Sequence, residues 1–288
     1  MSILKKIFPK GVKKTSRIAQ SEDVGKFYDN TTDKFIEVYG EVIQAFRTNN
    51  INDYLDYTIQ SAELQDGQMI LDAGCGVGGP ASYFASKLDI TIKGVTISKE
   101  QAKKAQTTLA EKRLKGTVII QQGDYHKIDE IFGENQFDRV LFLESFGHSN
   151  NQKLLIEKAF KVLKPGGILY IKDLFKREHP NAEDGKKIDK IVSEINKAYC
   201  YNVPDLHEVL SMVRRLNFIL LSLKTPEVKT EQFEHLTISN NFQNLFDIAK
   251  IISWEDYVFP IDFYELKVMK PTFDISKEKH LYFLNRPQ

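Results

Sequence analysis

Short apolar runs alternate with amphipathic segments through the middle of the chain. Five runs have the length and composition of buried strands, and they end near Asp72, Thr96, Gln122, Leu143 and Leu174. The segments between them carry apolar residues at helical spacing, as over 80–88, 98–109 and 154–164. Alternation of strands and helices is typical of a parallel sheet with right-handed crossover connections. The pattern therefore predicts an α/β protein.

The chain on either side of this region is mainly helical by pattern. From Ser21 onward, the recurrence of apolar residues predicts a helix with one apolar face, formed by Phe35, Val38, Tyr39, Val42 and Phe46. A second helix is predicted from about Asn52. Toward the C-terminus, the pattern predicts helices over 182–198 and 227–257 and strands over 218–224 and 263–271.

The first apolar run opens into a glycine-rich turn at 74–79, directly before a predicted helix. Glycine allows a bulky ligand to lie against the backbone, and the free N–H groups at a helix start favour ligand binding. This arrangement is typical of a nucleotide-binding loop. Gly74, Gly76 and Gly79 also satisfy the dinucleotide pattern G-x-G-x-x-G.

Two details favour S-adenosylmethionine (SAM) over a nicotinamide dinucleotide. Asp72 ends the strand before the glycines, where a carboxylate can approach the cationic amino-acid end of SAM, often through water, but would sit poorly beside a pyrophosphate. An NAD enzyme also needs an acid on the ribose about 20 residues further on. The corresponding segment, 94–98, contains no acid. An NAD(P) oxidoreductase is therefore the less favoured reading.

The segment around Gly74 resembles motif I of the class I SAM-dependent methyltransferases, and the resemblance extends over about residues 65–175. The sequence of 94–101, Gly-Val-Thr-Ile-Ser-Lys-Glu-Gln, is similar to that of a subgroup containing sterol, tocopherol and prenyl-diphosphate C-methyltransferases and cyclopropane fatty acid synthases. The resemblance implies that Thr96 and Gln101 lie along SAM and that Asp124 accepts a hydrogen bond from the adenine amino group. Ser98-x-x-Gln101 is also a capping box, so the helix start and the cofactor contact coincide. The expected cofactor-binding residues are Asp72, Ala73, Gly74, Cys75, Gly76, Thr96, Ile97, Ser98, Gln101, Gly123, Asp124, Tyr125 and Leu143.

The resemblance also implies the architecture. We expect an α/β fold with a Rossmann-like, doubly wound, seven-stranded and mostly parallel sheet, whose last strand is antiparallel, together with N-terminal helices and helical lid insertions. The expected regions are a basic flexible leader at 1–20, a helical cap at 21–64 and a SAM-binding methyltransferase domain at 65–288. Lid insertions are expected at about 178–212 and 226–258.

The composition of the chain limits the classes of partner that we expect. The net charge of +1 and the lack of a basic stripe in the core argue against nucleic acid as a partner. No signal peptide and no apolar run long enough to span a bilayer are visible, so we expect no stable membrane insertion and a cytoplasmic location. The two cysteines are far apart in the sequence, which suggests neither a disulfide framework nor a zinc site. The oligomeric state, a homo-oligomer included, is left open.

Candidate catalytic residues follow from the chemistry of methyl transfer. Displacement at a sulfonium methyl group mainly requires the acceptor to be held in line and water to be excluded. Methylation of an alkene leaves a carbocation, which a carboxylate stabilises and a base deprotonates. Glu144 ends the fourth predicted strand, and the subgroup named above has a similar Glu at the matching point. His148 is a candidate proton relay, and Tyr28, by resemblance to sterol-type methyltransferases, is a candidate pocket residue. The alternatives are a capping or ion-pair role for Glu144 and a structural role for His148.

The sequence thus predicts a SAM-dependent methyltransferase acting on a small lipophilic metabolite. The favoured reaction is C-methylation of an isoprenoid alkene, in a prenyl diphosphate or a terpenoid. No metal site formed by the protein is expected, and Mg²⁺ would be held mostly by a diphosphate substrate. N- or O-methylation of a small natural product is the first alternative, and a SAM-binding regulator without catalysis is the second.

Overall fold

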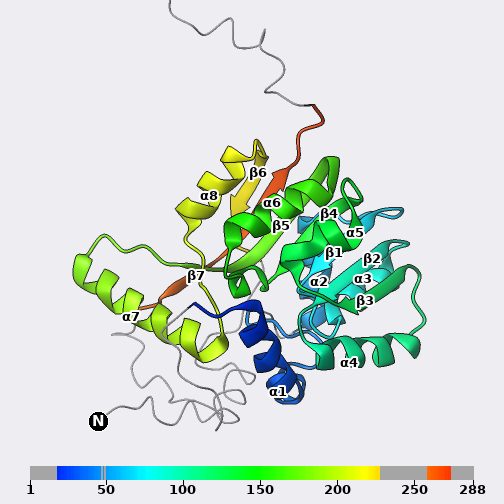
Figure 1. Ribbon diagram of the computed structural model, residues 1–288, viewed down its shortest axis with the longest axis horizontal. Helices are drawn as coiled ribbons and strands as arrows, with labels where there is room; N and C mark the ends of the chain where they lie inside the picture. Colours follow the sequence, from blue (N-terminus) through cyan, green and yellow to red (C-terminus); the bar gives the residue numbers. More distant parts are fainter. Residues whose placement is uncertain (1–17, 47, 49, 228–257, 274–288) are drawn as a thin grey trace, which may run out of the picture.

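The computed structural model describes residues 18–46, 48, 50–227 and 258–273 of the chain. A seven-stranded sheet with the order β3-β2-β1-β4-β5-β7-β6 forms its centre (Figure 1). The strands β1 to β5 are parallel to their neighbours, and β7 is antiparallel to both β5 and β6. Their bounds are β1 (Met69–Ala73), β2 (Thr91–Thr96), β3 (Thr117–Gln122), β4 (Phe137–Leu143), β5 (Leu163–Lys176), β6 (Ile219–Lys224) and β7 (Ile261–Met269). The predicted fold class is confirmed.

Helices cover both faces of the sheet. One face packs against α5, α6 and α8, and the other packs against α2 and α3. The helices are α1 (Ser21–Tyr39), α2 (Ile51–Ser61), α3 (Gly79–Lys87), α4 (Lys99–Ala110), α5 (Ile128–Phe132), α6 (Gln152–Val162), α7 (Ala182–Tyr199) and α8 (Leu206–Arg215). Short 3₁₀ turns follow β3 (η2, Tyr125–Lys127) and β4 (η3, Phe146–His148).

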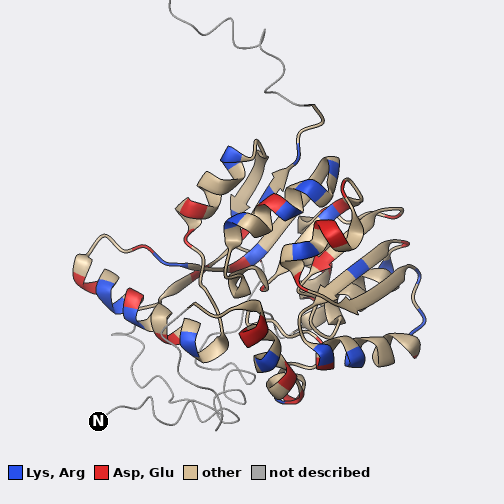
Figure 2. Ribbon diagram, viewed as in Figure 1, with Lys and Arg blue, Asp and Glu red and all other residues tan. Residues whose placement is uncertain are grey.

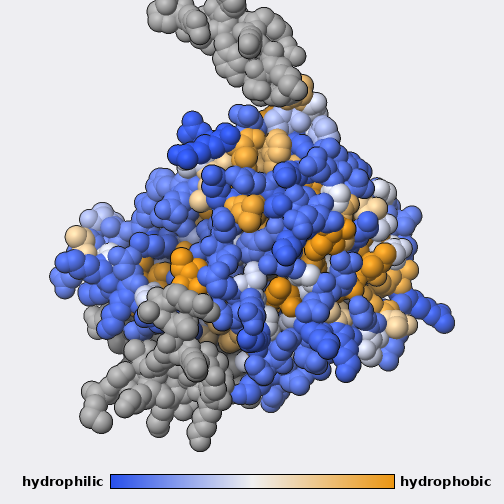
Figure 3. All heavy atoms as spheres, viewed as in Figure 1, coloured by the Kyte–Doolittle hydropathy of each residue, from blue (hydrophilic) through white to orange (hydrophobic). Residues whose placement is uncertain are grey.

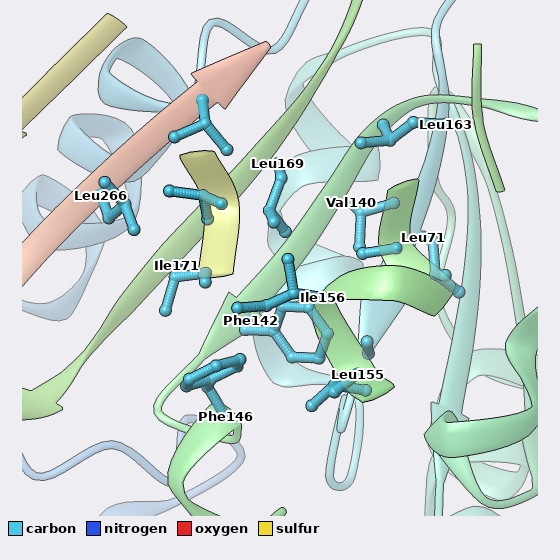
Figure 4. Close-up of a cluster of buried hydrophobic side chains, with 14 of the residues drawn as sticks. Leu71, Val140, Phe142, Phe146, Leu155, Ile156, Leu163, Leu169, Ile171 and Leu266 are labelled. Carbon is cyan, nitrogen blue, oxygen red and sulfur yellow. The ribbon is translucent and has the colours of Figure 1, made fainter. Parts of the chain in front are cut away.

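The period of two along each strand sends adjacent side chains to opposite faces of the sheet. Leu71 and Phe142 therefore join the cluster with Leu155 of α6 (Figure 4). Ile70 and Leu141, each one residue away, join the cluster beneath α2 and α3. Burial on both faces explains why these strands appear as nearly continuous apolar runs in the sequence.

The first helix is shorter than its apolar periodicity predicts. α1 ends at Tyr39, because Gly40 has a positive φ of +67°, which takes the backbone out of the helical conformation. Val42 and Phe46 are therefore not on its face, and the prediction that they extend it is wrong. Residues 41–46 instead form a non-helical segment, which we call the strap. Val42 is buried in the core beneath α2, which accounts for its apolar character.

Two further boundaries differ from the sequence prediction. The helix predicted over 154–164 ends at Val162, and β5 begins at Leu163, so the last two residues of the predicted helix belong to the strand. The helix α8 was not predicted. The predicted helix over 227–257, apart from its first residue, and most of the leader and second lid lie outside the described residues.

Charges of both signs are mixed along the described helices. Figure 2 shows acidic and basic residues interspersed along the helices. In Figure 3, small hydrophobic patches on the visible face are separated by hydrophilic side chains. A membrane-crossing helix is absent from the described residues, since none of their helices combines sufficient length with sufficient apolar character.

Candidate active site

A cleft opens where the carboxyl ends of the parallel strands meet, with α1 and the strap on its other side. Ligands of open α/β sheets bind at this edge. Most residues that the sequence singled out line this cleft: Tyr28, Gly74, Gly76, Thr96, Ile97, Gln101, Asp124, Tyr125, Leu143, Glu144 and His148. Tyr28 is contributed by α1, and the others come together because each lies at or shortly after the end of a strand of the same sheet.

Some predicted residues lie behind the wall of the cleft, and some lining residues were not predicted. Asp72, Ala73, Cys75, Ser98 and Gly123 are not among the lining residues. The lining residues that sequence reasoning missed are Ser21, Val24, Ile43 and Ser145. Ser145 directly follows Glu144, so its position was a usable signal. The other three belong to α1 and the strap, and no sequence signal indicated how these elements pack on the sheet.

The glycine loop presents its backbone to the cleft. Gly74 and Gly76 have φ values of +86° and +56°, a region that favours glycine. A Cβ atom on Gly74 would lie 2.4 Å from Cβ of Ser145, whereas one on Gly76 would meet no atom within 4 Å. The open side of Gly76 therefore faces space that a ligand can occupy.

Asp72 lies behind the loop at the end of β1. Its side chain is 2% exposed, and Oδ2 accepts no hydrogen bond from the described residues. Burial raises the pKa of Asp72 to about 7. A cation bound nearby would lower this pKa and stabilise the carboxylate. An unsatisfied buried carboxylate oxygen behind a glycine loop fits the positive amino-acid end of SAM.

Asp124 is fixed in its ionised form at the end of β3. Its Oδ1 accepts hydrogen bonds from the backbone N–H of His126 at 2.9 Å and from the ring Nδ1 of His126 at 2.7 Å. Nε2 of the same ring lies 2.7 Å from the hydroxyl group of Ser149. Burial raises the pKa of Asp124, but the hydrogen bonds from His126 outweigh it and lower the value to about 2. A permanently ionised acceptor suits the adenine amino group.

The start of α4 is tied to α1 at the mouth of the cleft. The Ser98 hydroxyl group accepts from the backbone N–H of Gln101 at 3.1 Å and donates to Asp29 of α1 at 2.6 Å. The Thr96 hydroxyl group donates to Oε1 of Gln101 at 2.8 Å, which orients the Gln101 amide with its NH₂ group as a donor. Ser98 thus caps α4 and links it to α1, whereas Oε1 of Gln101, which the predicted capping box would direct to the Ser98 backbone, accepts from Thr96.

Glu144 has an unusual backbone and a firmly held carboxylate. Its φ is +57°, which is uncommon for a non-glycine residue. The backbone N–H groups of Ala45 and Phe46 in the strap donate to its two carboxylate oxygens at 2.6 and 3.2 Å. Its side chain is 6% exposed, and Oε1 lies 4.0 Å from Nζ of Lys172. These groups all favour the ionised carboxylate at the edge of the cleft.

Tyr28 and His148 form a hydrogen-bonded pair. Nδ1 of His148 lies 3.1 Å from the carbonyl oxygen of Cys200, which can only accept, so Nδ1 carries the proton. Nε2 of the neutral ring is therefore an acceptor, and the Tyr28 hydroxyl group donates to it at 2.8 Å. Burial lowers the pKa of His148 to about 4 and raises the pKa of Tyr28 above its usual value. Both groups are therefore neutral near pH 7.

A buried carboxylate holds the turn that carries His148. Asp173, at 0% exposure, accepts from the backbone N–H groups of Phe146 and Gly147 at 2.9 and 3.2 Å. The Tyr201 hydroxyl group also donates to Asp173, and the Tyr201 ring packs edge-on against His148 with centroids 4.4 Å apart. Asp173 and Tyr201 are supporting residues that sequence reasoning missed, because their partners are distant in the sequence.

A metal-binding cluster is not found in the described part of the chain, where no three His, Cys, Asp or Glu side chains could hold one ion. The donor set of the cleft fits SAM instead. It combines open glycine backbone, the Gln101 amide and the ionised Asp124, and the unsatisfied Asp72 oxygen lies behind the loop.

Comparison with known proteins places this cleft in a family context. The family model of mycolic acid cyclopropane synthetases matches residues 48–225, more than half of the chain. An O-methyltransferase of Penicillium expansum is 27% identical over 248 residues, which covers 80% of this chain and 87% of that protein. The sterol 24-C-methyltransferase of Saccharomyces cerevisiae is 35% identical over 111 residues, which covers 38% of this chain and 28% of the yeast protein.

Solved structures share the fold. The cyclase SpnF matches with a TM-score of 0.71 at 22% identity, covering 91% of this chain and 100% of that chain. A geranyl diphosphate C-methyltransferase from Streptomyces coelicolor A3(2), solved with Mg²⁺, geranyl diphosphate and S-adenosylhomocysteine, matches with a TM-score of 0.64 at 15% identity, covering 90% of this chain and 100% of that chain. At these identities the likeness establishes the fold alone.

Proposed function

The chain belongs to the mycolic acid cyclopropane synthetase family and is a SAM-dependent methyltransferase of small molecules, and we propose that its reaction is C-methylation of an isoprenoid alkene. SAM supplies an electrophilic methyl group when bound. The residues that would hold it are the glycine loop at 74–76, Thr96, Gln101, Asp124 and, behind the loop, Asp72.

The position of Glu144 carries the proposal. Its carboxylate lies at the cleft, accepts hydrogen bonds from two strap amide groups and lies 4.0 Å from the ammonium group of Lys172. Methylation of an alkene creates positive charge on the acceptor, and a fixed negative charge placed there stabilises it without rearrangement. Glu144 is therefore assigned as the residue that stabilises the cationic intermediate of the acceptor.

The Tyr28–His148 pair supplies a route for the proton that must then leave the acceptor. The phenol oxygen of Tyr28 accepts that proton while its own proton passes to Nε2 of His148. The proton on Nδ1 stays hydrogen-bonded to the Cys200 carbonyl group. A low pKa for His148 means that the imidazolium returns its proton to solvent readily at neutral pH.

The charge of the acceptor is left to experiment. Neither Lys nor Arg is among the residues that line the described part of the cleft. A diphosphate acceptor would bring Mg²⁺ with it, whereas a neutral terpenoid needs no such ion. Both classes of acceptor therefore belong in the test.

O- or N-methylation is the second candidate. The same Tyr28–His148 pair can take a proton from a hydroxyl or ammonium group that is about to be methylated. The match with a fungal O-methyltransferase supports this reading as well. In this scheme Glu144 would orient the acceptor and would not stabilise a carbocation.

Incubation with a radiolabelled methyl donor separates the two candidates. The acceptor panel contains prenyl diphosphates with and without Mg²⁺, neutral terpenoids, sterols, phenols and amines. Label on the isoprenoid alkenes supports C-methylation. Label only on the phenols or amines shows that the C-methylation proposal is wrong.

A further inference from the structure

A lysine side chain is completely buried behind Glu144. Lys172 lies on β5 and is 0% exposed. Its Nζ donates to Oε1 of Gln44 in the strap at 2.5 Å and lies 4.0 Å from the ring centroid of Tyr54 in α2. Burying an ammonium group is costly unless nearby charges compensate it. The groups around Lys172 should therefore explain its presence.

Carboxylates face this lysine from the strands on both sides of β5. On β4, the first residue after the strand is Glu144, whose Oε1 lies 4.0 Å from Nζ. On β7, Glu265 is directly opposite Lys172 in the antiparallel register and is 1% exposed. Oε2 of Glu265 accepts from the Ser61 hydroxyl group at 2.5 Å, whereas Oε1 accepts no hydrogen bond from the described residues.

Other titratable groups complete the surroundings of Lys172. Asp173 is adjacent on β5, but its carboxylate is occupied by the turn after β4. Tyr170 lies two residues before Lys172 on the same strand and is buried. Tyr54 contributes its ring face to Lys172 and donates its hydroxyl proton to Gln44 at 3.0 Å. Glu265 and Asp173 therefore compensate the ammonium group electrostatically, and Glu144 is the carboxylate at the cleft that lies within 4.0 Å of it.

The strap connects the lysine to the site. Gln44 binds Lys172, and the next two residues, Ala45 and Phe46, bind the Glu144 carboxylate through their N–H groups. The carboxylate is therefore held from one side by the strap and from behind by the ammonium group. One buried cation stabilises both the carboxylate and the segment that orients it.

We propose that Lys172 is a positioning residue, whose buried ammonium group keeps the Glu144 carboxylate ionised and oriented at the cleft, while Glu265 keeps that ammonium group charged. The proposal rests on the proposed function, because it requires Glu144 to act as a carboxylate in methyl transfer. It assigns to Lys172 no contact with the cofactor or the acceptor.

The pH dependence follows from the charge on Lys172. Burial lowers the pKa of Lys172 to about 7, although Glu265 and Asp173 act to raise it. The positive charge is present below this pKa and is lost as pH rises through it. Turnover of a non-ionising alkene should therefore fall above about pH 7 in the wild-type enzyme.

Two substitutions separate charge from packing. Lys172→Arg retains a cation at every accessible pH, so the fall in kcat above neutral pH should disappear. Lys172→Met retains an unbranched side chain without charge, so kcat should fall about tenfold. Because Glu144 loses its neighbouring cation, the loss of turnover at low pH should also begin about one pH unit higher. Affinity for SAM should stay close to the wild-type value in both variants.

A control and a double variant make the test specific. Lys93→Met removes a lysine from β2, where its Nζ lies near the Phe132 ring, and should leave the pH profile unchanged. If Lys172 acts through Glu144, then Lys172→Met should have little further effect on kcat in a Glu144→Gln background. Full additivity of the two effects would overturn the proposal.

The outcomes also separate this proposal from the proposed function. If Glu144→Gln retains wild-type turnover, the role of Glu144 is wrong, and the Lys172 proposal falls with it. If Glu144→Gln is inactive but Lys172→Met keeps both limbs of the wild-type profile, only the Lys172 proposal is wrong. If Lys172→Met fails to fold, Lys172→Arg alone decides. A fall in kcat above pH 7 that persists in Lys172→Arg refutes the proposal, and the disappearance of this fall supports it.

Discussion

The hydroxyl group of Tyr28 lies 2.8 Å from Nε2 of His148, which joins α1 to the turn after β4 across 120 residues of sequence. The contact brings a phenol from the N-terminal cap to the carboxyl edge of the sheet. Both residues line the cleft together with the glycine loop. The helix α1 is therefore a part of the site.

Removal of this phenol should slow turnover and leave cofactor binding nearly intact. Tyr28→Phe keeps the ring that packs edge-on against His148 but removes the hydroxyl group. Loss of a proton-transfer group typically costs about 10²-fold or more in rate, so we expect kcat to fall by about that factor. Steady-state kinetics and SAM titration measure the two effects. Tyr39→Phe, on the same helix but outside the cleft lining, is the control.

Glu144→Gln tests the carboxylate with little change in volume. The amide oxygen can still accept from one of the two strap N–H groups, whereas the NH₂ group cannot accept from the other, and the side chain carries no charge to stabilise a cation. Turnover should fall by about 10²- to 10³-fold, as when an electrostatic stabiliser is removed from other enzymes. SAM affinity, measured by calorimetry, should change less than about threefold, since Glu144 is not expected to bind SAM. A fall in SAM affinity equal to the fall in turnover would contradict the catalytic role of Glu144.

Gly76→Ala should separate cofactor binding from stability. The new methyl group would meet no protein atom within 4 Å, so the stability cost is mainly that of a left-handed alanine, about 1 kcal/mol. The same group would occupy ligand space, and SAM affinity should fall at least about tenfold. Gly67→Ala, with φ +83° and open space around it, carries a similar backbone cost away from the site. Equal SAM affinity in the two variants would show that SAM does not lie against the loop.

Asp124→Asn should reduce both stability and cofactor affinity. Hydrogen bonds with His126 lower the pKa of Asp124 to about 2 in the folded protein, whereas the unfolded chain has a value near 4. The ionised carboxylate therefore stabilises the fold above about pH 4. This contribution, about 2 kcal/mol at neutral pH, is lost as pH falls from about 4 to about 2. Denaturant unfolding of both proteins as a function of pH should show the difference shrinking over that window. A constant difference would mean that the ionised form is not the source of stability.

The sequence was sufficient to predict the sheet and one wall of the cleft. Strands buried on both faces leave apolar runs, and parallel strands bring their carboxyl ends to one edge. Placing Thr96, Asp124 and Glu144 at strand ends was therefore enough to predict that they meet. The chemical roles of these residues remain predictions.

The other wall could not be predicted, because it depends on tertiary packing. The apolar residues of the strap continue the periodicity of α1, although the chain leaves the helix at Gly40. Lys172 and Glu265 lie in strands, where charged residues usually mark an exposed position, yet both are buried. Only the three-dimensional structure shows that the strap, Lys172 and Glu144 hold one another.

The position of the transferred methyl group tests the account most directly. The enzyme would be incubated with SAM carrying a ¹³C-labelled methyl group and with the best isoprenoid acceptor, and the product would be examined by NMR. The account predicts a labelled methyl carbon bonded to a carbon atom of the former alkene. A label found only on oxygen or nitrogen, or a product that carries no label, would contradict it.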